Sequence, residues 1–309
     1  MSNTPLNATR LGPTFACRVD DFDISEDSLQ TSSRAIYETF LEHGAVVFRR
    51  QDITPSVFSK FGEVFGLPEV HHLRQLRHPE QPTLSLLSNQ PEPGRRAESR
   101  TSGQGWHSDY SYKLRPGSAT MLHGIEIPES GGDTLFADSQ AAFLDLPADR
   151  KRQLRALRAI HHYRWSTDRT DPWARWTYIG EQERRETPPV SHPLVRVHPD
   201  TGVESLFIQP FIVGSVRGIE GMTLDDSVGL IDELIAHITQ DQYVYRHQWK
   251  PLDVVVWDNR RLLHSATTKD LDPSIPRRLL RLTTHGQPVT PADPAVGYTR
   301  LLPADDDEV

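Results

Sequence analysis

The chain has 309 residues, of which 36% are hydrophobic and 25% charged, and its formal net charge is -8. This is the composition of a globular protein, and a net acidic chain is not expected to bind nucleic acid. Cys17 is the single cysteine, which excludes an internal disulfide and cysteine-rich metal sites. With no apolar run long enough for a membrane span and no signal-peptide pattern, we expect a cytoplasmic protein without membrane contact.

The N-terminal part of the chain predicts a helix, a strand and a second helix. Apolar residues recur at helical spacing over 27–43, and Gly44 follows as a stop signal. The segment AVVFRR at 45–50 is a short apolar strand. Thr54 and the proline after it open a second helix that is expected to run through Phe65.

From about residue 100 onward, strands predominate. Strands are expected at 118–127, 131–138, in a hairpin within 193–209, and at 253–258 and 277–286. Helices are expected between them at 138–158 and 224–240. This pattern predicts a mostly β fold with flanking helices, a double-stranded β-helix (jelly-roll, cupin-like) barrel that forms a single domain over residues 1–309.

Two segments stand apart from this pattern. Residues 161–192 have little periodicity and several tryptophans, which fits either a lid over a pocket or an insert packed on the surface by its own aromatic residues. Residues 287–309 combine a stretch rich in Pro and Ala with a final acidic run, and we expect a loosely ordered tail.

The strongest local feature is the segment WHSD at 106–109. On an extended segment the side chains of His107 and Asp109 point to the same side, and His264, after a buried strand and a turn, would add a third ligand. Two histidines and one carboxylate leave half of an octahedral metal open, which is typical of non-haem Fe(II) oxygenases. Taken alone, the pair is weak evidence and is more often a surface histidine beside an aspartate.

Six motifs in order resemble the taurine dioxygenase (TauD/TfdA) family, which also includes aryloxyalkanoate dioxygenases. They are WHSD at 106–109, PESGGDTLFAD at 128–138, HPLVRVHPDTG at 192–202, IEGMT at 219–223, VVVWDNRRLLH at 254–264 and RRLLRLTTHG at 277–286. The resemblance covers roughly residues 35–286 and is carried by the order of the motifs rather than by any one of them.

The resemblance implies Fe(II), 2-oxoglutarate and O2 as cofactor and co-substrates. Iron would be held by His107, Asp109 and His264, and the distal carboxylate of 2-oxoglutarate by Thr134 and Arg278. Arginine suits that role because its guanidinium is always charged and matches a carboxylate with two parallel hydrogen bonds. Related halogenases replace the carboxylate ligand with a small residue, so Asp109 argues against halogenation.

The reaction implied is oxidation, mainly hydroxylation, of a C–H bond in a small molecule with release of succinate and CO2. Two alternatives stay open. The same chemistry gives desaturation or cyclisation in specialised metabolism, and a metal-binding barrel without catalysis would need neither Thr134 nor Arg278. The resemblance also leaves a homo-oligomer open.

At the position where family members bind the substrate anion, this sequence differs from the family pattern. In members that handle sulfonates or carboxylates, a second arginine follows the 2-oxoglutarate arginine by four residues, and from Arg278 that position is Leu282. Period-two alternation places Arg278, Leu280 and Leu282 on one face and Arg281 on the other, which argues against a substrate anion held in the usual way. A one-residue bulge would instead turn Arg281 inward.

Other candidates for substrate contact come from position only. His71 lies near a substrate-contact histidine of the family, and Arg74, just after it, could replace the missing cation, although a solvated loop is the favoured interpretation of both. Tyr110, Phe207 and Gln209 could line the substrate site or simply pack in the core. The remaining histidines without ligand spacing to a carboxylate are interpreted as structural; they are His161, His162 and His192.

Overall fold

The computed structural model describes residues 5–71, 76–90, 103–163, 187–210, 216–269 and 271–302. In this part of the chain the fold is mostly β with a few helices. Contacts group the residues into two compact units. Unit 1 comprises residues 1–104, 117–138 and 241–286, and unit 2 comprises residues 105–116, 139–240 and 287–309.

Unit 1 is built on a seven-stranded and a three-stranded sheet. In spatial order, the larger sheet consists of β1 (Ala8–Arg10), β2 (Cys17–Val19), β3 (Ala45–Phe48), β13 (Val254–Asp258), β5 (Ala119–Glu126), β15 (Arg278–Thr283) and β4 (Ser85–Ser88). The smaller sheet consists of β12 (Val244–His247), β6 (Thr134–Asp138) and β14 (Leu262–Ala266). A short 3-10 turn, Asp241–Tyr243, precedes β12. The strands expected from the sequence in this unit are therefore confirmed.

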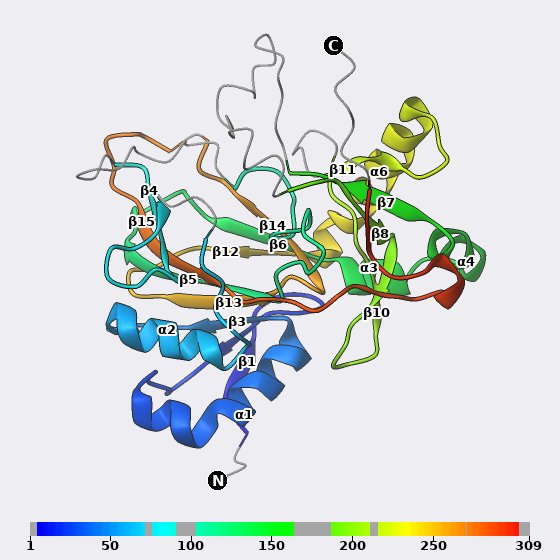
Figure 1. Cartoon of the computed structure of the whole chain (residues 1–309). Coiled ribbons are helices and arrows are strands. Elements are labelled where there is room, and N and C mark those ends of the chain that lie inside the picture. Colours follow the sequence, from blue (N-terminus) through cyan, green and yellow to red (C-terminus); the bar gives the residue numbers. More distant parts are fainter. Residues whose placement is uncertain are drawn as a thin grey trace. The chain divides into compact units, whose positions relative to one another are not determined.

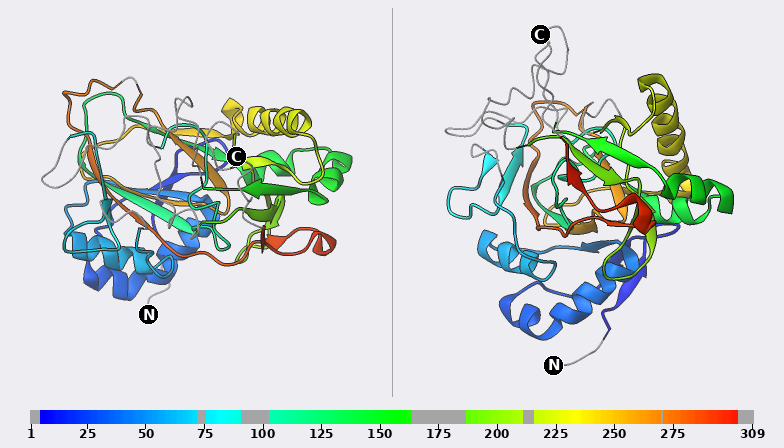
Figure 2. Two further views of the ribbon diagram at one scale, coloured as in Figure 1. Left: turned by 45° about the horizontal axis from the view of Figure 1, so that its top comes forward. Right: turned by 45° about the vertical axis from the view of Figure 1, so that its right-hand side comes forward.

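Two capped helices cover one face of the larger sheet. Helix α1 (Glu26–His43) begins at Ser25, which exchanges capping hydrogen bonds with Ser28, and ends at Gly44 with φ 69°. Helix α2 (Pro55–Glu63) begins at Thr54, whose hydroxyl accepts from the Val57 N–H. Figures 1 and 2 show both helices on the same side of the sheet. Both helices expected from the N-terminal sequence are confirmed.

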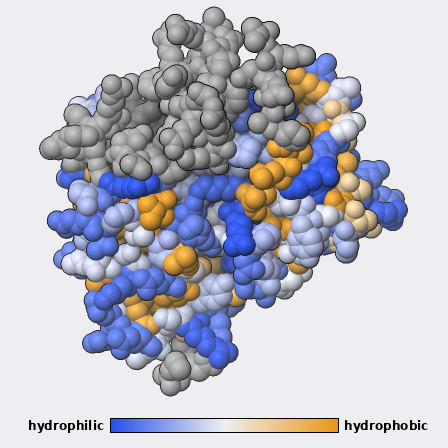
Figure 3. Space-filling view, in the orientation of Figure 1, coloured by the Kyte–Doolittle hydropathy of each residue, from blue (hydrophilic) through white to orange (hydrophobic). Residues whose placement is uncertain are grey.

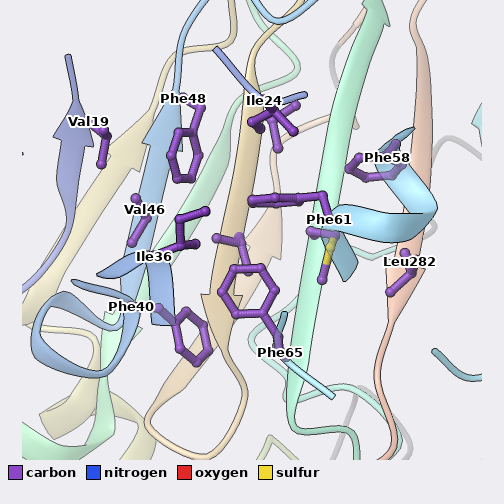
Figure 4. Close-up of a cluster of buried hydrophobic side chains, with 14 of the residues drawn as sticks. Val19, Ile24, Ile36, Phe40, Val46, Phe48, Phe58, Phe61, Phe65 and Leu282 are labelled. Carbon is purple, nitrogen blue, oxygen red and sulfur yellow. The ribbon is translucent and has the colours of Figure 1, made fainter. Parts of the chain in front are cut away.

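The two faces of the larger sheet carry different cores. The helix-side core joins α1 and α2 to the sheet through aromatic residues such as Phe40, Phe48 and Phe61 (Figure 4). The inter-sheet core lies on the opposite face, where Val255 and Trp257 of β13 share a buried cluster with residues of the smaller sheet, among them Phe136 and Leu262. The central strands β3, β13, β5 and β15 thus contribute alternate residues to the two cores.

Cys17 belongs to the helix-side core and is fully buried. Burial raises the pKa of its thiol to about 12, and the nearby carboxylate of Glu42 acts in the same direction. The thiol is therefore a packing group in β2 and stays protonated at neutral pH.

Unit 2 holds two small sheets and three helices in its described part. One sheet has the order β11 (Val216–Ile219), β7 (Arg158–His161), β8 (Val190–Pro193) and β17 (Arg300–Leu301). The other has the order β10 (Glu204–Leu206), β9 (Val195–Val197) and β16 (Thr290–Pro291), and β9 and β10 form the expected hairpin. The helices are α3 (Ser139–Leu144), α4 (Ala148–Arg155) and α6 (Leu224–Ile238), as the patterns at 138–158 and 224–240 predicted.

The C-terminal segment differs from the loose tail expected over 287–309. Its described part contributes β16 and β17 to the two sheets of unit 2 and forms a short 3-10 turn at Pro294–Val296. The Leu302 N–H also donates to the Pro189 carbonyl at 2.9 Å. Backbone pairing holds this segment although its Pro and Ala content lacks strand periodicity. Residues 303–309, and residues 164–186 of the expected lid or surface insert, lie outside the described residues.

The surface is mixed in character. On the face shown in Figure 3, hydrophobic residues lie among hydrophilic ones. Over the described residues as a whole, exposed large apolar side chains include Leu67 and Tyr298. Such scattered exposure is ordinary in globular proteins. Among the helices in the described ranges, none combines the length and apolarity that crossing a bilayer would require.

Candidate metal and 2-oxoglutarate site

His107 and Asp109 lie in a loop of unit 2 and not in a named strand, so the extended segment expected for them is not present. Their side chains nevertheless approach each other, with His107 Nε2 3.9 Å from an Asp109 carboxylate oxygen. Two ligands that are each about 2.1 Å from one metal ion lie at most about 4.2 Å apart, so this separation fits a shared ion.

The hydrogen bonding of His107 suits a ligand. Its Nδ1 lies 2.8 Å from the Gly105 carbonyl oxygen, which can only accept. Nδ1 therefore carries the proton, and Nε2, the atom nearer Asp109, presents a lone pair. A bond of this kind fixes both the ring orientation and the tautomer that metal binding requires.

The loop around Asp109 is held by buried side chains on both sides. The amide of Gln209 donates to the Ser108 carbonyl at 3.3 Å, and His192 Nε2 donates to the Ser111 carbonyl at 2.8 Å. Tyr110 between them has φ 56°, a left-handed conformation that is rare for a residue with a side chain. The chain thus turns immediately after Asp109, and the turn is fixed by side-chain contacts.

His264 is held differently, in unit 1. It lies in the middle of β14, where it pairs with Phe136 of β6. Its ring packs on Trp257 with centroids 4.7 Å apart, and the residue is buried. Period-two alternation along β14 therefore turns His264 toward the side where Trp257 of the inter-sheet core lies.

The ligand atoms of His107, Asp109 and His264 all lie within 4.8 Å of one another. Two imidazoles and one carboxylate are donors suited to a first-row divalent ion, and three ligands leave part of an octahedral sphere open. The donor set therefore fits Fe(II), as the sequence predicted.

Thr134, the predicted hydroxyl donor for 2-oxoglutarate, opens β6 and is buried. Its Oγ1 accepts a hydrogen bond from Trp249 Nε1 at 3.0 Å. A hydroxyl that accepts one bond still has its own proton to give, so Thr134 can donate to an anion from a buried position.

The two arginines at the start of β15 have different surroundings. Arg278, the predicted partner of 2-oxoglutarate, lies beside Glu126, with Nη1 3.5 Å from a carboxylate oxygen, and both side chains are partly exposed. Arg277 is buried, and its Nε donates to the Gly132 carbonyl at 3.1 Å. A Cβ at Gly132 would lie 2.9 Å from that Nε, so the Arg277 side chain rests directly on the turn that leads into Thr134.

Leu280 and Leu282 of β15 share a face, as predicted, but this is the face that the helices cover. Both belong to the helix-side core, and Figure 4 shows Leu282 close to α2. A Cβ at Gly62 of α2 would lie 2.6 Å from Leu282 Cδ1. The prediction that Leu282 faces the substrate is therefore wrong, and its apolar side chain carries no information about the substrate's charge.

Arg281 lies on the opposite face of β15. Leu279, two residues before it, belongs to the inter-sheet core, and Arg281 pairs directly with Leu122 of β5, a member of the same core. Directly paired residues of antiparallel strands point to the same side. The register shift considered from the sequence is present between Arg278 and Leu279.

The remaining candidates that the structure describes are buried residues. His71 is buried, and its carbonyl accepts from Arg77 Nε at 2.6 Å, whereas Arg74 lies outside the described residues. Tyr110 packs edge-on against Tyr112 with ring centroids 6.1 Å apart. Phe207 stacks on His161 at 4.9 Å. Core packing accounts for the two aromatic residues, and Gln209 holds the metal-ligand loop.

A mostly β fold with this donor set defines the class of mononuclear non-haem iron oxygenases. The family profile described as "Taurine catabolism dioxygenase TauD, TfdA family" matches residues 7–283, a longer stretch than the motifs alone indicated. The chain belongs to this family of 2-oxoglutarate-dependent dioxygenases.

Named relatives agree with the family. The alpha-ketoglutarate-dependent 2,4-dichlorophenoxyacetate dioxygenase of Burkholderia sp. (strain RASC) is 33% identical over 91% of this chain and 95% of the relative. Pentalenolactone F synthase of Streptomyces arenae is 32% identical over 91% and 94%. The crystal structure of AAD-2 in complex with Mn(II) and N-oxalylglycine has a TM-score of 0.78 and 26% identity, and covers 93% of this chain and 99% of AAD-2.

The protein is thus an Fe(II)- and 2-oxoglutarate-dependent dioxygenase that acts on a small molecule. The sequence predicted the enzyme class, and it predicted as metal donors three side chains that the structure brings together. It did not identify the buried position of Arg277, the inward face of Arg281 or the contact of His192 with the ligand loop.

Proposed function

We propose that the enzyme oxidises, by hydroxylation, a C–H bond of a small organic acid, with release of succinate and CO2. The observation that carries this proposal is the position of Arg281 on the inter-sheet face of β15. Trp257 of β13, which packs on His264, lies on the same face of the sheet, so the Arg281 side chain and a predicted metal ligand share this side. The name of the relative that acts on 2,4-dichlorophenoxyacetate, a carboxylate, agrees with this class.

We assign the distal carboxylate of 2-oxoglutarate to Arg277 and Thr134 in place of Arg278. The assignment is supported by the burial of Arg277, by its contact with Gly132 and by the spare proton of Thr134. Counted from Arg277, the position four residues further is Arg281. With this one-residue correction, the spacing of two arginines described for acid-handling members of the family is present in this chain.

The bound iron would supply the coordination positions for 2-oxoglutarate and O2 and the oxidising power for attack on the C–H bond. The chain's own residues position the reactants. His107, Asp109 and His264 hold the metal, Arg277 and Thr134 bind one end of 2-oxoglutarate, and Arg281 orients the substrate acid. The inter-sheet core keeps this region apolar, which strengthens each charged contact.

A substrate screen tests the acid class. Succinate release is measured with sulfonates, aryloxy acids and amino acids, and with their neutral amide or alcohol analogues. We expect turnover with at least one acid and none with its neutral analogue. Equal turnover of a neutral analogue would overturn the acid class while leaving the dioxygenase class intact.

Matched arginine variants test the assignments. Arg281→Leu should weaken apparent binding of the acid substrate by tens to a hundredfold, since a hydrogen bond to a charged group contributes about 1.5–3 kcal/mol. Arg277→Leu should weaken apparent binding of the 2-oxoglutarate co-substrate to a similar extent. Arg278→Leu, next to it, is the control and should change both affinities less than about threefold, the range of an exposed ion pair. The opposite result for Arg277 and Arg278 would restore Arg278 as the 2-oxoglutarate residue.

Desaturation or cyclisation is the second candidate reaction, and the similarity to pentalenolactone F synthase keeps it open. The mass of the product separates the two reactions, because hydroxylation adds one oxygen whereas desaturation or ring closure removes two hydrogens.

We also propose the architecture, location and assembly expected from the sequence. A double-stranded β-helix barrel and a single catalytic domain are supported by the similarity to AAD-2 over 93% of the chain. A cytoplasmic location is supported by the single, buried cysteine. A homo-oligomer is tested by light scattering, with a mass above 35.1 kDa as the expected result.

A further inference from the structure

The C-terminal strap, residues 294–302, lies beyond residue 283, where the match to the family ends. In unit 2 it runs across β7 and β8, and β17 within it pairs with β8, with Arg300 opposite Ser191 and Leu301 opposite Val190. The strap is thus joined to β8 by backbone pairing.

Arg158 of β7 fastens the strap. Its guanidinium is buried and donates to the carbonyls of Val296 and Gly297, both at 2.7 Å, and of Tyr298 at 3.0 Å. The same group donates to the hydroxyl and the carbonyl of Ser191 at 2.7 Å. An arginine that gives this many bonds to neighbouring carbonyls fixes the path of the backbone up to Thr299.

Thr299 connects the strap to His192. Its hydroxyl lies 2.7 Å from His192 Nδ1, and His192 Nε2 lies 2.8 Å from the Ser111 carbonyl. A carbonyl only accepts, so Nε2 must carry the ring proton, and in a neutral ring Nδ1 then accepts from the Thr299 hydroxyl. The Ser111 carbonyl thus sets the tautomer of His192, and the Thr299 hydroxyl holds the ring in place from its other nitrogen.

His192 is held in the neutral form by its surroundings. It is fully buried, with its ring edge-on to His161 at 5.0 Å and 5.1 Å from Phe207. Burial lowers the pKa of His192 to about 3, and the cationic Arg196 and Arg158 act in the same direction. The ring therefore carries one proton at working pH, which leaves Nδ1 free to accept from Thr299.

We propose that the strap is a positioning element of the metal site: Thr299 orients His192, and His192 holds the carbonyl of Ser111, two residues after the ligand Asp109. The inference rests on the proposed role of Asp109 as a metal ligand. Outer residues that orient a ligand typically change metal affinity by about 10–100-fold. Thr299 and His192 are positioning residues, and neither is expected to touch substrate.

Three variants of the strap test the proposal. Thr299→Val keeps the shape of the side chain and removes the hydroxyl, Thr299→Ser keeps the hydroxyl, and Arg300→Ala breaks a different strap contact, the ion pair with Glu220 at 2.7 Å. Each purified full-length protein is titrated with Mn(II) without substrate, and free Mn(II) is measured by electron paramagnetic resonance. Thermal unfolding and kcat are measured on the same samples.

We expect Thr299→Val to weaken Mn(II) binding about tenfold. Thr299→Ser should restore it to within about twofold of the wild type, and Arg300→Ala should leave it unchanged, with similar small changes in melting temperature for Thr299→Val and Arg300→Ala. Wild-type affinity in Thr299→Val, or equal losses of affinity in Thr299→Val and Arg300→Ala, would overturn the proposal. Absence of Mn(II) binding by the wild type would instead overturn the metal site itself.

Discussion

Two segments carry the proposed metal donors, and they are held in different ways. The β14 strand carries His264 and is fixed by a continuous backbone ladder with β6 from Leu262 to Ala266. The loop at residues 105–113 carries His107 and Asp109 and lies outside the named strands. Its carbonyls are held by Gln209 and His192, two side chains distant in sequence.

Because β14 is held by a backbone ladder and the loop by side chains, substitutions near the two segments should have different effects. A ladder shares its hydrogen bonds over many residues, so its register resists the loss of one side chain. In the loop, the Ser108 carbonyl accepts from Gln209 and the Ser111 carbonyl accepts from His192, so loss of either side chain removes a contact that positions the loop. We therefore expect substitutions of residues that pack in and beside β14 to lower mainly the stability of the fold. Substitutions of residues that hold the loop should lower mainly the affinity for the metal.

Loss of a ligand is the largest expected effect and should be the same for both segments. Asp109→Ala and His264→Ala should each reduce succinate release to that of wild-type protein treated with a chelator, because two donors cannot hold the ion in place. Iron content after reconstitution checks the reason. Retention of iron-dependent turnover in either variant would exclude that residue as a ligand.

Loss of stability from a cavity at β14 should be the next largest effect. Leu263, next to His264, is buried, and Leu263→Ala should lower the free energy of unfolding by about 2–5 kcal/mol. Urea unfolding measures this change, and Mn(II) titration of the folded protein should give the wild-type affinity. A tenfold loss of affinity without a loss of stability would contradict the role given to the ladder.

Lowering the pH should destabilise the fold through His192, which holds the Ser111 carbonyl of the loop. The folded pKa of His192 is depressed from 6.5 to about 3, so its contribution to stability is complete above pH 6.5 and is lost as the pH falls toward 3. Each pH unit changes the free energy by about 1.4 kcal/mol, which gives about 2 kcal/mol between pH 6.5 and 5. Urea unfolding of the metal-free protein at both pH values measures the loss. His192→Gln should reduce the loss by about this amount, while other buried histidines such as His161, whose pKa burial also lowers, keep the remainder. Equal stability at the two pH values would contradict a buried neutral His192.

Gln209→Leu should have the smallest effect on stability and a clear effect on the metal. The Gln209 side chain is fully buried, and among the described residues its Oε1 has no hydrogen-bond partner. Replacing a buried, half-satisfied amide with an apolar group should change the free energy of unfolding by less than about 1–2 kcal/mol. Mn(II) affinity should fall about tenfold, because the Ser108 carbonyl loses its donor. Unchanged affinity would show that the loop keeps its geometry without Gln209.

Motif identity and periodicity allowed most of the fold to be predicted. The helix spacing at 27–43, the stop at Gly44 and the apolar strand at 253–258 have local causes, so the sequence alone predicted them. The metal donors were predictable because their residue types and order follow the family, even though the expected extended segment at His107 is a loop.

The face of β15 could not be predicted in the same way. The segment RRLLRL alternates equally well in either phase, so the pattern does not say whether Arg277 or Arg278 is buried. The choice depends on the irregular pairing with β5 near Glu126 and on the space that Gly132 and Gly62 leave beside the strand. The strap was missed for a similar reason, since Arg158 fastens it through backbone carbonyls, which every residue has.

Cys17 gives this oxygen-using enzyme a built-in reporter. Peroxide and alkylating reagents attack the thiolate, and a thiol with a pKa of about 12 and no exposed surface offers almost none of it. The only thiol of the chain is therefore protected from oxidants formed during catalysis for as long as β1, β2 and β3 stay paired. The rate at which a thiol reagent labels Cys17 would then measure how often that edge of the sheet opens, without any mutation.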